Sequence, residues 1–307
     1  MNDRKTLFII NPNANLGTAW KQAADLKPIM DEFGGADWAG SVYPTHAIEL
    51  TKKGIEDGYD LIIAGGGDGT VHEVINAIMS YPKERRPALG VIPLGSGNDF
   101  SYAVGLDPVP WKALRQIFTG EPTWIDIGEL SDDWGRTIYV DNTVGIGFDA
   151  VVTIYSHDMP LVKGFMMYLA AVLKTIFLNH QPMGLKLSVD DQAVWEDRLI
   201  MLTFCNGPRE GGGFMLYPEA SLEDGLFHYV AIQEVGRGTM LFRLLPAFLN
   251  GTHLPHPKVM SGSFSRFSLE SDSPLYIHVD GEIIAGFTND LRKVDLKVHH
   301  QAIQAYF

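Results

Sequence analysis

The arrangement of hydrophobic and polar positions along the chain changes near residue 128. Before it, short runs of consecutive apolar residues alternate with segments whose apolar positions recur every three or four residues. An uninterrupted apolar run is typical of a strand buried on both faces, and the longer repeat is typical of an amphipathic helix. The alternation predicts βαβ units around a parallel sheet. The predicted strands are residues 6–10, 60–64 and 89–92, and the predicted helices are residues 19–33, 71–80 and 111–118.

Beyond residue 128, most segments alternate between apolar and polar residues and are separated by turn-forming residues. This spacing predicts a sandwich of antiparallel strands. We therefore expect a Rossmann-like α/β domain with a parallel sheet over residues 1–128, a linker at 125–129, and an all-β sandwich over residues 129–298. The predicted strands of the second domain are residues 136–140, 183–189, 198–205, 226–232, 264–270, 275–279 and 294–298.

The most informative junction is residues 61–70, Leu-Ile-Ile-Ala-Gly-Gly-Gly-Asp-Gly-Thr, where an apolar strand ends in glycines before a helical pattern. Glycines let several backbone N–H groups converge on an anion at the start of the next helix, so the junction predicts phosphate binding. Asp68 cannot itself bind the phosphate. Its carboxylate is expected to meet a metal ion or the proton of an attacking hydroxyl. The alternative is an ordinary turn in which Asp68 caps the helix.

A second junction of the same kind follows residues 89–92. Pro93 ends the strand, and Gly95 and Gly97 permit a tight turn. Loops that follow neighbouring parallel strands lie on one edge of the sheet, where open α/β folds bind ligands. The short polar residues at the start of the following helix are Ser96, Asn98 and Asp99.

Two acidic residues, Asp280 and Glu282, lie one residue apart after a predicted strand. Their side chains can share one face across Gly281. Paired carboxylates suit metal coordination or general-base work on a substrate hydroxyl. The alternative is a hairpin turn with exposed acids.

Composition narrows the class of protein. The chain has 307 residues, of which 46% are hydrophobic and 20% are charged. This length and composition are typical of a globular enzyme whose two domains each have a hydrophobic core. The single cysteine, Cys205, excludes an internal disulfide and fits a reducing compartment. The apolar run at residues 7–10 is too short for a secretory signal, so we expect a cytoplasmic protein.

The formal net charge of −13 disfavours nucleic acid as a partner and, on average, anionic lipid headgroups. If the protein contacts a membrane, only a small part of its surface is expected to face the lipid. The best candidate is the apolar segment at residues 160–178, flanked by Lys163 and Lys174, which is too short and interrupted for a transmembrane span. A buried or groove-lining helix is favoured, with interfacial contact or an acyl-chain wall as alternatives.

Other patterns are interpreted as structural. Residues 145–150 fit a loose GxGxxA dinucleotide fingerprint, but they lie among β-type segments, so a glycine-mediated turn is favoured. Asp224 would be an ordinary turn acid in most proteins. The histidine pair His299 and His300, and the loop residues His253 and His256, are expected to be solvated and to bind no metal.

On its motifs the chain resembles the diacylglycerol kinase catalytic-domain family, soluble bacterial lipid kinases related to sphingosine and ceramide kinases and more distantly to NAD kinases. The resemblance covers nearly the whole chain. The GGDGT element is shared with NAD kinases, whereas the Gly-Asn-Asp-Phe and Asp-Gly-Glu elements separate the chain from them. The motifs are Asn11-Pro12, residues 66–70 with Glu73, residues 93–100, Asp224-Gly225, and residues 280–282.

The resemblance implies a fold and an activity. It implies ATP-dependent transfer of the γ-phosphoryl group to a hydroxyl of a diacylglycerol-like lipid, with Mg²⁺, transient contact with a membrane surface, and compatibility with a homodimer. It also implies that residues 299–307 return to the first domain. An NAD kinase-like enzyme and a non-catalytic lipid-binding or nucleotide-binding protein are the alternatives. The acceptor lipid is not determined by these motifs.

The resemblance further implies roles for individual residues. Glu282 is the expected general base, supported by Asp280, with Asp68 as a rival. Thr45 is either a helix N-cap or a nucleotide contact. The sequence departs from the family at residues 14–17, Ala-Asn-Leu-Gly, where relatives carry a small residue and a glycine directly after Asn-Pro. The expected ATP contacts are Asn11, Pro12, Asn13, Thr45, Gly66, Gly67, Asp68, Gly69, Thr70, Glu73 and Ser96; the expected metal ligands are Asp224 with the carbonyls of Ser221 and Leu226 for a structural Mg²⁺, and Asp126 and Asp99 for Mg²⁺ bound with ATP.

Overall fold

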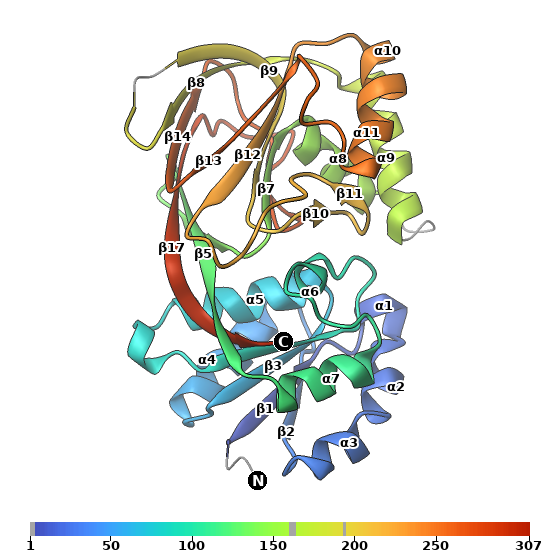
Figure 1. Cartoon of the computed structure of the whole chain (residues 1–307), viewed down its shortest axis with the longest axis vertical. Helices are drawn as coiled ribbons and strands as arrows, with labels where there is room; N and C mark the ends of the chain where they lie inside the picture. Colours follow the sequence, from blue (N-terminus) through green and yellow to red (C-terminus); the bar gives the residue numbers. More distant parts are fainter. Residues whose placement is uncertain (1–3, 160–163, 193–194) are drawn as a thin grey trace. The chain divides into compact units, whose positions relative to one another are not determined.

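The structure of the protein is a computed structural model that describes residues 4–159, 164–192 and 195–307. It divides into two compact units. Unit 1 consists of Met1–Ile127 and His300–Phe307, and unit 2 consists of Gly128–His299. Figure 1 shows the order of the helices and strands along the chain.

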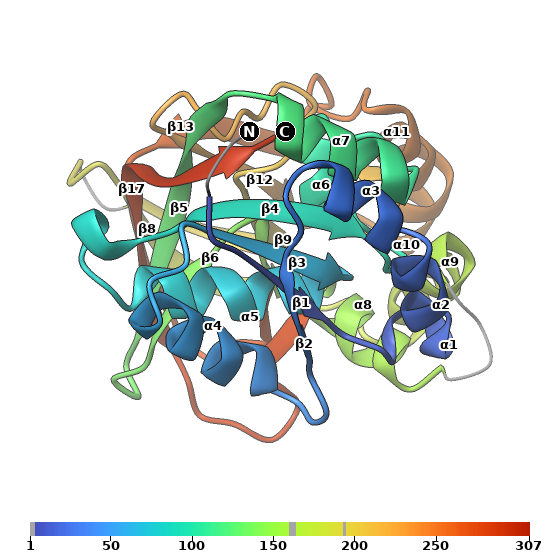
Figure 2. The same cartoon turned by 90° about the horizontal axis from the view of Figure 1, so that it is seen from below.

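Unit 1 contains a parallel sheet. Its strand order is β4-β3-β1-β2, and the last residues of the long strand β17 pair in parallel with β4 (Figure 2). Because all these strands run in one direction, their carboxyl ends share one edge of the sheet. The elements are β1 (Thr6–Ile10), β2 (Asp37–Gly40), β3 (Leu61–Gly66), β4 (Ala88–Pro93) and β17 (Lys293–Tyr306).

Helices cover both faces of this sheet: α4 and α5 pack on one face, and α2, α3 and α7 on the other (Figure 2). The prediction of one helix over residues 19–33 is wrong. The chain forms two helices there, and Pro28 lies in the first turn of the second. A proline is tolerated at this position because N–H groups of the first turn have no acceptor within the helix. The helices are α1 (Ala14–Gly17), α2 (Ala19–Ala24), α3 (Lys27–Glu32), α4 (His46–Glu56), α5 (Asp68–Met79), η1 (Lys83–Arg85), α6 (Asp99–Ala103) and α7 (Pro110–Thr119).

Unit 2 is an antiparallel β-sandwich, so the predicted fold class of both parts of the chain is confirmed. The prediction of one strand over residues 264–270 is wrong, because Ser265 separates two strands with different partners: β13 pairs with β12, and β14 pairs with β8 and β17. The strands are β5 (Pro122–Asp132), β6 (Thr137–Val140), β7 (Thr143–Gly147), β8 (Met183–Val189), β9 (Trp195–Cys205), β10 (Arg209–Glu210), β11 (Phe214–Met215), β12 (Phe227–Gln233), β13 (Val259–Phe264), β14 (Arg266–Ser271), β15 (Ile277–Val279) and β16 (Glu282–Ala285).

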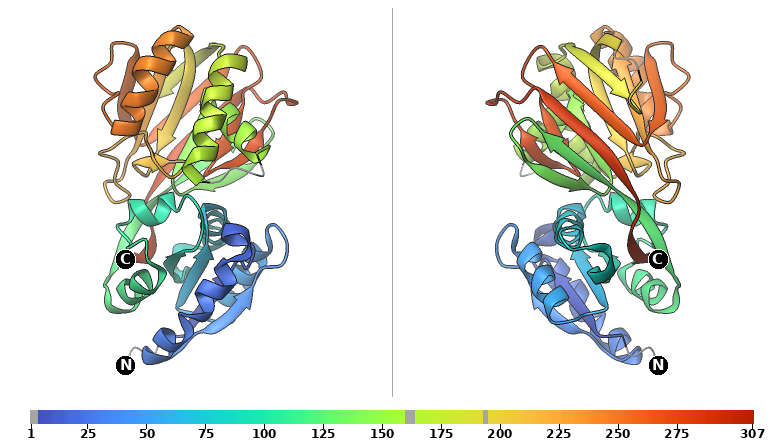
Figure 3. Two further views of the ribbon diagram at one scale, coloured as in Figure 1. Left: turned by 90° about the vertical axis from the view of Figure 1, so that its right-hand side faces the viewer. Right: turned by 90° about the vertical axis from the view of Figure 1, so that its left-hand side faces the viewer.

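The strand β12 explains how unit 2 builds two cores. Phe227 and Ala231 point into a cluster of apolar side chains from the sandwich strands. Val230 and Ile232 belong to a second cluster, formed with residues of the helices. Figure 3 shows these helices on one face of the unit 2 sheet. Successive side chains of a strand alternate between faces, so one apolar strand supports both cores. The helices are α8 (Phe148–His157), α9 (Gly164–Leu178), α10 (Arg237–Thr239), the π-helix η2 (Met240–Leu244) and α11 (Leu245–Asn250).

The predicted linker at residues 125–129 is not an irregular segment. These residues form the middle of β5, which pairs with β6 and β17. Ile125 and Ile127 are fully buried, and this burial keeps the segment in extended strand geometry rather than in a loop.

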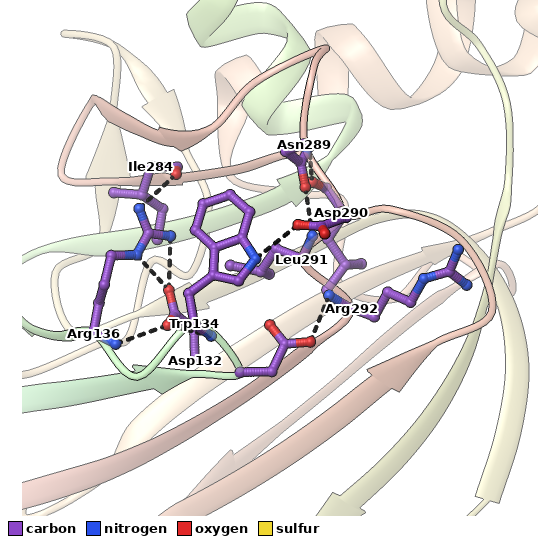
Figure 4. Close-up of polar contacts among 10 residues, drawn as sticks. Asp132, Trp134, Arg136, Ile284, Asn289, Asp290, Leu291 and Arg292 are labelled. Carbon is purple, nitrogen blue, oxygen red and sulfur yellow. Dashed lines mark hydrogen bonds and ion pairs between the residues drawn. The ribbon is translucent and has the colours of Figure 1, made fainter.

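A group of polar and aromatic side chains holds the β5–β6 hairpin to β16 and to the segment that follows it (Figure 4). Arg136 pairs with Asp132, with 2.7 Å between Nη2 and Oδ2, and donates from Nη1 to the carbonyl of Ile284 (3.0 Å). Its guanidinium lies 4.3 Å from the ring centre of Trp134, whose indole N–H donates to Asp290 (2.9 Å). Guanidinium stacking and charged hydrogen bonds of this kind fix position as well as adding stability.

Gly145 and Gly147 lie in β7, and α8 begins directly after Gly147. Gly147 has a φ of 75°, so the predicted glycine-mediated turn at residues 145–150 is confirmed as the change of direction from β7 to α8. A Cβ on Gly145 would lie 2.1 Å from Nε2 of His278 and 2.6 Å from Oδ2 of Asp149. Only glycine therefore leaves room for these two side chains.

We expect Gly145→Ala to lower the free energy of unfolding by about 1–3 kcal/mol, because overpacking forces buried groups apart. Urea denaturation of this variant measures the loss. Gly236→Ala is the matched control, since Gly236 has a φ of −72° and no atom within 4 Å of an added Cβ. Equal stability of the two variants would show that the neighbourhood of Gly145 can relax.

Candidate functional site

The carboxyl edge of the unit 1 sheet carries the loops that follow its strands. The N–H of Asn11 donates to the carbonyl of Gly65, and the N–H of Leu94 donates to the carbonyl of Gly66, both at 2.9 Å. These bonds extend the strand pairing into the loops. Both predicted glycine loops therefore lie side by side on the same edge.

The two glycine loops touch through their backbones. A Cβ on Gly95 would lie 2.3 Å from Cα of Gly67, and a Cβ on Gly66 would lie 2.3 Å from Oγ1 of Thr70. Asn98, at a φ of 52°, closes the second loop by accepting from the N–H of Gly95 (2.9 Å) and donating to its carbonyl (3.1 Å). Glycine is required here for close approach of two backbones.

Asp68, the first residue of α5, joins the two loops. Its carboxylate accepts from the N–H of Phe100 at 3.2 Å, at the start of α6. Burial raises the pKa of Asp68, while hydrogen bonds from the N–H groups of Phe100, Asp99, Asn98 and Asp68 itself act in the opposite direction. The carboxylate thus organises the second loop, a role that sequence reasoning did not assign to it.

Glu73 caps the helix α4. Its carboxylate accepts from the N–H of Thr45 (2.9 Å) and the N–H of Ala47 (3.0 Å). Thr45 is the N-cap residue of α4, as one of the two predictions had it, but its side chain makes no capping hydrogen bond, and the carboxylate of Glu73 caps the helix instead. A carboxylate suits this position because the amino end of a helix carries partial positive charge. Thr45 is exposed and has a φ of 69°.

The loop after β1 begins with an Asx turn, in which the side chain of Asn11 accepts from the N–H of Asn13 (3.0 Å). Pro12 lies between them, and Asn13 immediately precedes α1. The residues that depart from the family pattern form α1, a single helical turn. Of the remaining expected contacts, Gly69 lies in α5 and Ser96 is exposed in the second glycine loop.

Asp126 and Asp99 are both buried. Oδ1 of Asp126 lies 2.8 Å from Nδ1 of His300 and accepts from the N–H of Gln301 (2.7 Å), where the backbone has a φ of 52°. Asp126 therefore holds the bend in β17. Asp99 is the first residue of α6.

The prediction that the histidines are solvated is wrong for His253 and holds only in part for His299, which is half-buried; His300 is exposed, as predicted. His300 contacts Asp126, and His299 lies 2.7 Å from Oε2 of Glu129. His253 is fully buried, with Nε2 2.7 Å from the carbonyl of Leu216. Burial lowers the pKa of His253, because a charged imidazole would lose its hydration.

Unit 2 contains a small apolar pocket, with a cavity volume of about 60 Å³, that is partly open to solvent. It lies between the sheet and the helices α8, α9, η2 and α11. Tyr168 and Val172 of α9 line it, which confirms the prediction of a groove-lining helix for the described part of residues 160–178; residues 160–163, with Lys163, lie outside the described residues. Its apolar walls include Phe148, Val152, Phe214, Leu216, Met240 and Phe248.

The polar end of this pocket is formed by Asp149 and Glu210, with His278 behind them. Nε2 of His278 lies 3.1 Å from Oε1 of Glu210 and 3.7 Å from Oδ2 of Asp149. Burial, then the charge of Asp149, raise the pKa of Glu210. Burial alone would lower the pKa of His278, but the two carboxylates raise it to about 10.

Sequence reasoning missed this acidic cluster, defined here as Asp149, Glu210 and His278. The available signal was weak: a histidine inside the apolar strand β15 and an acid in the first turn of α8, after a strand rich in glycine. Nothing local connects these residues, because each comes from a different element.

Asp280 and Gly281 form the two-residue turn between β15 and β16, with φ values of 50° and 85°. The carboxylate of Asp280 is buried and accepts from the N–H groups of Asp141 (3.1 Å), Asn142 (2.9 Å) and Thr143 (2.9 Å). Glu282 is exposed at the start of β16. The two carboxylates therefore occupy different environments, and the expectation of a like pair on one face is wrong.

Asp224 lies in the turn before β12. Oδ1 accepts from the N–H of Leu226 (3.0 Å), and Oδ2 lies 3.3 Å from Nε2 of His228. Burial lowers the pKa of His228, while the charge of Asp224 raises it. The hydroxyl of Ser221 accepts from the N–H of Glu223 (3.3 Å). These bonds give the turn a compact shape in which Asp224 has a defined position.

Within residues 4–159, 164–192 and 195–307, no helix has both the length and the apolar character needed to span a membrane.

Comparisons with known proteins agree with the fold and with the motifs. Residues 5–130 match the diacylglycerol kinase catalytic domain, and residues 142–302 match the YegS C-terminal NAD kinase beta sandwich-like domain. A solved structure described as "a putative diacylglycerol kinase" from Bacillus anthracis str. Sterne has a TM-score of 0.79 at 20% identity, covering 100% of this chain and 98% of the other. That likeness concerns the fold.

Two relatives with curated names are similar in sequence. A "Probable lipid kinase YegS-like" from Chromohalobacter salexigens is 34% identical over 244 residues, which is 76% of this chain and 73% of the relative. A "Diacylglycerol kinase" from Staphylococcus aureus (strain JH9) is 29% identical over 304 residues, 95% of this chain and 92% of the relative. With both domain models matched in order, the chain belongs to the diacylglycerol kinase catalytic-domain family of YegS-like lipid kinases.

Proposed function

We propose that this protein is an ATP-dependent lipid kinase that transfers the γ-phosphoryl group to a hydroxyl of a diacylglycerol-like lipid. The observation that carries the proposal is the pair of glycine loops in backbone contact at the carboxyl edge of a parallel sheet. Their N–H groups suit the phosphates of a nucleotide. The apolar pocket of unit 2 supports a lipid acceptor rather than a dinucleotide such as NAD, because its walls offer few polar partners.

Asp68 and Asp99 lie beside Gly97 of the second glycine loop, whereas Asp126 lies at the bend in β17. Carboxylates fit Mg²⁺, a hard cation that prefers carboxylate and phosphate oxygens. Asp68 is the most accessible of them, whereas Asp99 and Asp126 are buried. We assign Asp68 to the ion bound with ATP, with Asp99 and Asp126 holding the surrounding segments. Bound there, Mg²⁺ would neutralise phosphate charge during transfer. The remaining expected contacts, Asn11, Pro12, Asn13, Thr45, Gly66, Gly67, Gly69, Thr70, Glu73 and Ser96, would shape or contact the nucleotide site.

We assign Glu282 as the general base and Asp280 as the residue that positions its turn. Glu282 is exposed and can accept a proton from a bound hydroxyl. Asp280 accepts three N–H groups from residues 141–143, and Arg136 binds the carbonyl of Ile284, so the short hairpin that carries Glu282 is held on both sides. Asp68 is the rival base.

Radiolabelled ATP with lipids in mixed micelles tests the function. We expect phosphorylation of diacylglycerol by the wild type, and a loss of roughly 10²-fold or more in Asp68→Asn, which removes the anionic partner of the metal or proton. Circular dichroism checks that the variant is folded. No labelled lipid from any acceptor, or activity of Asp68→Asn within a few-fold of wild type, would count against the proposal.

Glu282→Gln and Asp280→Asn should behave differently. If Glu282 is the base, its amide lowers kcat by roughly 10²-fold or more, with little change in the KM for ATP or in Tm. Asp280→Asn lowers Tm as well, because an amide cannot accept from all three N–H donors. Steady-state kinetics and thermal melts separate the two. A larger effect of Glu282→Gln on ATP affinity than on kcat would make Glu282 a nucleotide or metal ligand instead.

We further propose a structural Mg²⁺ held by Asp224 and the carbonyls of Ser221 and Leu226. A ligand that binds only the native state raises its stability by mass action. We therefore expect Mg²⁺ to raise the Tm of the wild type without nucleotide, and not that of Asp224→Ala. Glu223→Ala, an exposed acid of the same turn, is the matched control. An identical Mg²⁺ response in all three proteins would leave Asp224 as a turn residue only.

A further inference from the structure

An exposed aromatic stack lies at the carboxyl edge of the unit 1 sheet, in the loop that follows β2. The rings of Tyr43 and His46 are nearly parallel, with 4.4 Å between their centres and 18° between their planes. His46 covers one face of the phenol ring, yet Tyr43 remains 48% exposed. The ring therefore offers its other face to a flat ligand.

Hydrogen bonds within the loop and α4 hold both rings of the stack in place. The hydroxyl of Tyr43 donates to Oε2 of Glu49 (2.8 Å). The N–H of Val42 donates to Nδ1 of His46 (3.1 Å), which fixes the imidazole against the phenol ring. A ring that is held in this way loses little conformational freedom when a ligand stacks on it, so more of the stacking energy contributes to affinity.

The main chain of this loop is also fixed. Thr45 has a φ of 69°, which is an uncommon conformation for a β-branched residue. Glu73 of α5 holds it there by accepting from the N–H groups of Thr45 and Ala47. Since α5 begins at Asp68, in the first glycine loop, one helix connects the aromatic stack to that loop. A strained backbone that neighbouring groups hold in place is characteristic of ligand sites.

Main-chain hydrogen bonds mark the path from the stack to the glycine loops. The N–H of Ser41 donates to the carbonyl of Ile10 (2.8 Å), and the N–H of Asn11 donates to the carbonyl of Gly65 (2.9 Å). In the sheet, β2 is next to β1, and β1 is next to β3 (Figure 2). Neighbouring strands are about 4.8 Å apart, so the loop after β2 lies about 10 Å from the first glycine loop. A nucleotide with its phosphates on the glycine loops can span this distance.

The charges around the stack favour an uncharged group over a phosphate. Glu49 accepts from the hydroxyl of Tyr43, and Glu73 accepts from backbone N–H groups of the same loop, so both bring negative charge to this end of the edge. These carboxylates repel a phosphate. A neutral aromatic base meets no such repulsion, and its π-face stacks on a phenol ring.

Given the ATP-dependent function proposed above, on which this inference rests, we propose that Tyr43 is the stacking platform for the adenine base of ATP and that His46 is a positioning residue which holds the phenol ring. The ribose then lies along the loop after β1, and the phosphates lie on the glycine loops. Because stacking accepts any aromatic base, the platform separates nucleotides from polyphosphates without a base and discriminates little among purines.

Calorimetric titration with ATP and Mg²⁺ tests the platform. We expect Tyr43→Leu to raise the Kd for ATP about fivefold or more, since this is the usual effect of removing a stacked ring, and Tyr43→Phe to keep most of the affinity. The Kd for inorganic tripolyphosphate with Mg²⁺ should be the same in wild type and both variants. In the lipid kinase assay, Tyr43→Leu should raise the KM for ATP and leave kcat nearly unchanged, because the base is remote from the reacting atoms.

Tyr59→Leu is the matched control. The hydroxyl of Tyr59 also donates to a carboxylate, that of Asp37 (2.6 Å), but Tyr59 precedes β3 and so lies at the amino edge of the sheet. Its substitution should leave ATP binding unchanged. Thermal melts without nucleotide check that all three variants are folded.

The possible failures are distinguishable. Wild-type affinity for ATP in Tyr43→Leu, an equal loss in Tyr43→Phe, or an equal loss of tripolyphosphate binding would each overturn the platform while leaving the kinase function intact. Absence of ATP binding by the wild type would instead overturn the proposed function, and the inference with it.

Discussion

Hydrogen bonds from main-chain N–H groups to a few acidic side chains hold the loops of this protein in place. Asp68 binds the second glycine loop, Glu73 the start of α4, Asp126 the bend in β17, and Asp280 the segment at residues 141–143. Loop N–H groups that lack a strand or helix partner must find another acceptor when they are buried. A carboxylate can satisfy two or three of them at once, and each such bond contributes on the order of 1.5–3 kcal/mol.

This use of acids changes how the motifs are interpreted. In GGDGT and DGE, the aspartate accepts backbone N–H groups from a segment distant in sequence. The glycines of GGDGT allow the close approach of the two loops, whereas Gly281 of DGE supplies the positive φ of the turn. The side chain that organises a loop and the side chain that takes part in chemistry can therefore be the same in Asp68. In the later motif the two roles are divided between buried Asp280 and exposed Glu282. Kinetic effects of substitutions in either motif require a parallel measurement of stability.

The two units offer different chemical groups to the ligands proposed for them. Unit 1 offers converging N–H groups and short polar side chains at a sheet edge, which suit a polyphosphate. Unit 2 offers a small apolar pocket with an acidic end, which differs in chemistry from the glycine loops. The pocket exists because strands such as β12 are apolar on both faces, so that the sheet can support the sandwich core and the helical layer together.

The sequence by itself determined the fold class, the two glycine loops and many strands, because these depend on patterns within a few residues. The strands at residues 6–10 and 183–189 have the predicted bounds. Edge strand β2, with no fully buried residue, gave no comparable apolar signal. The break between α2 and α3 has a local cause that the prediction overlooked, because Pro28 has no N–H to donate to the carbonyl of Ala24. The break at Ser265 depended on which partners the flanking strands meet.

Only the tertiary structure decided which polar groups meet. Thr203 and Asp149 are 54 residues apart, and Thr143 and Glu210 are 67 residues apart, yet each pair is hydrogen-bonded. His278 reaches the same cluster through the pairing of β15 with β7. No local sequence pattern predicts these contacts, because strand register and helix packing determine them. A shift of one residue in the register of a strand would turn each of its side chains to the opposite face.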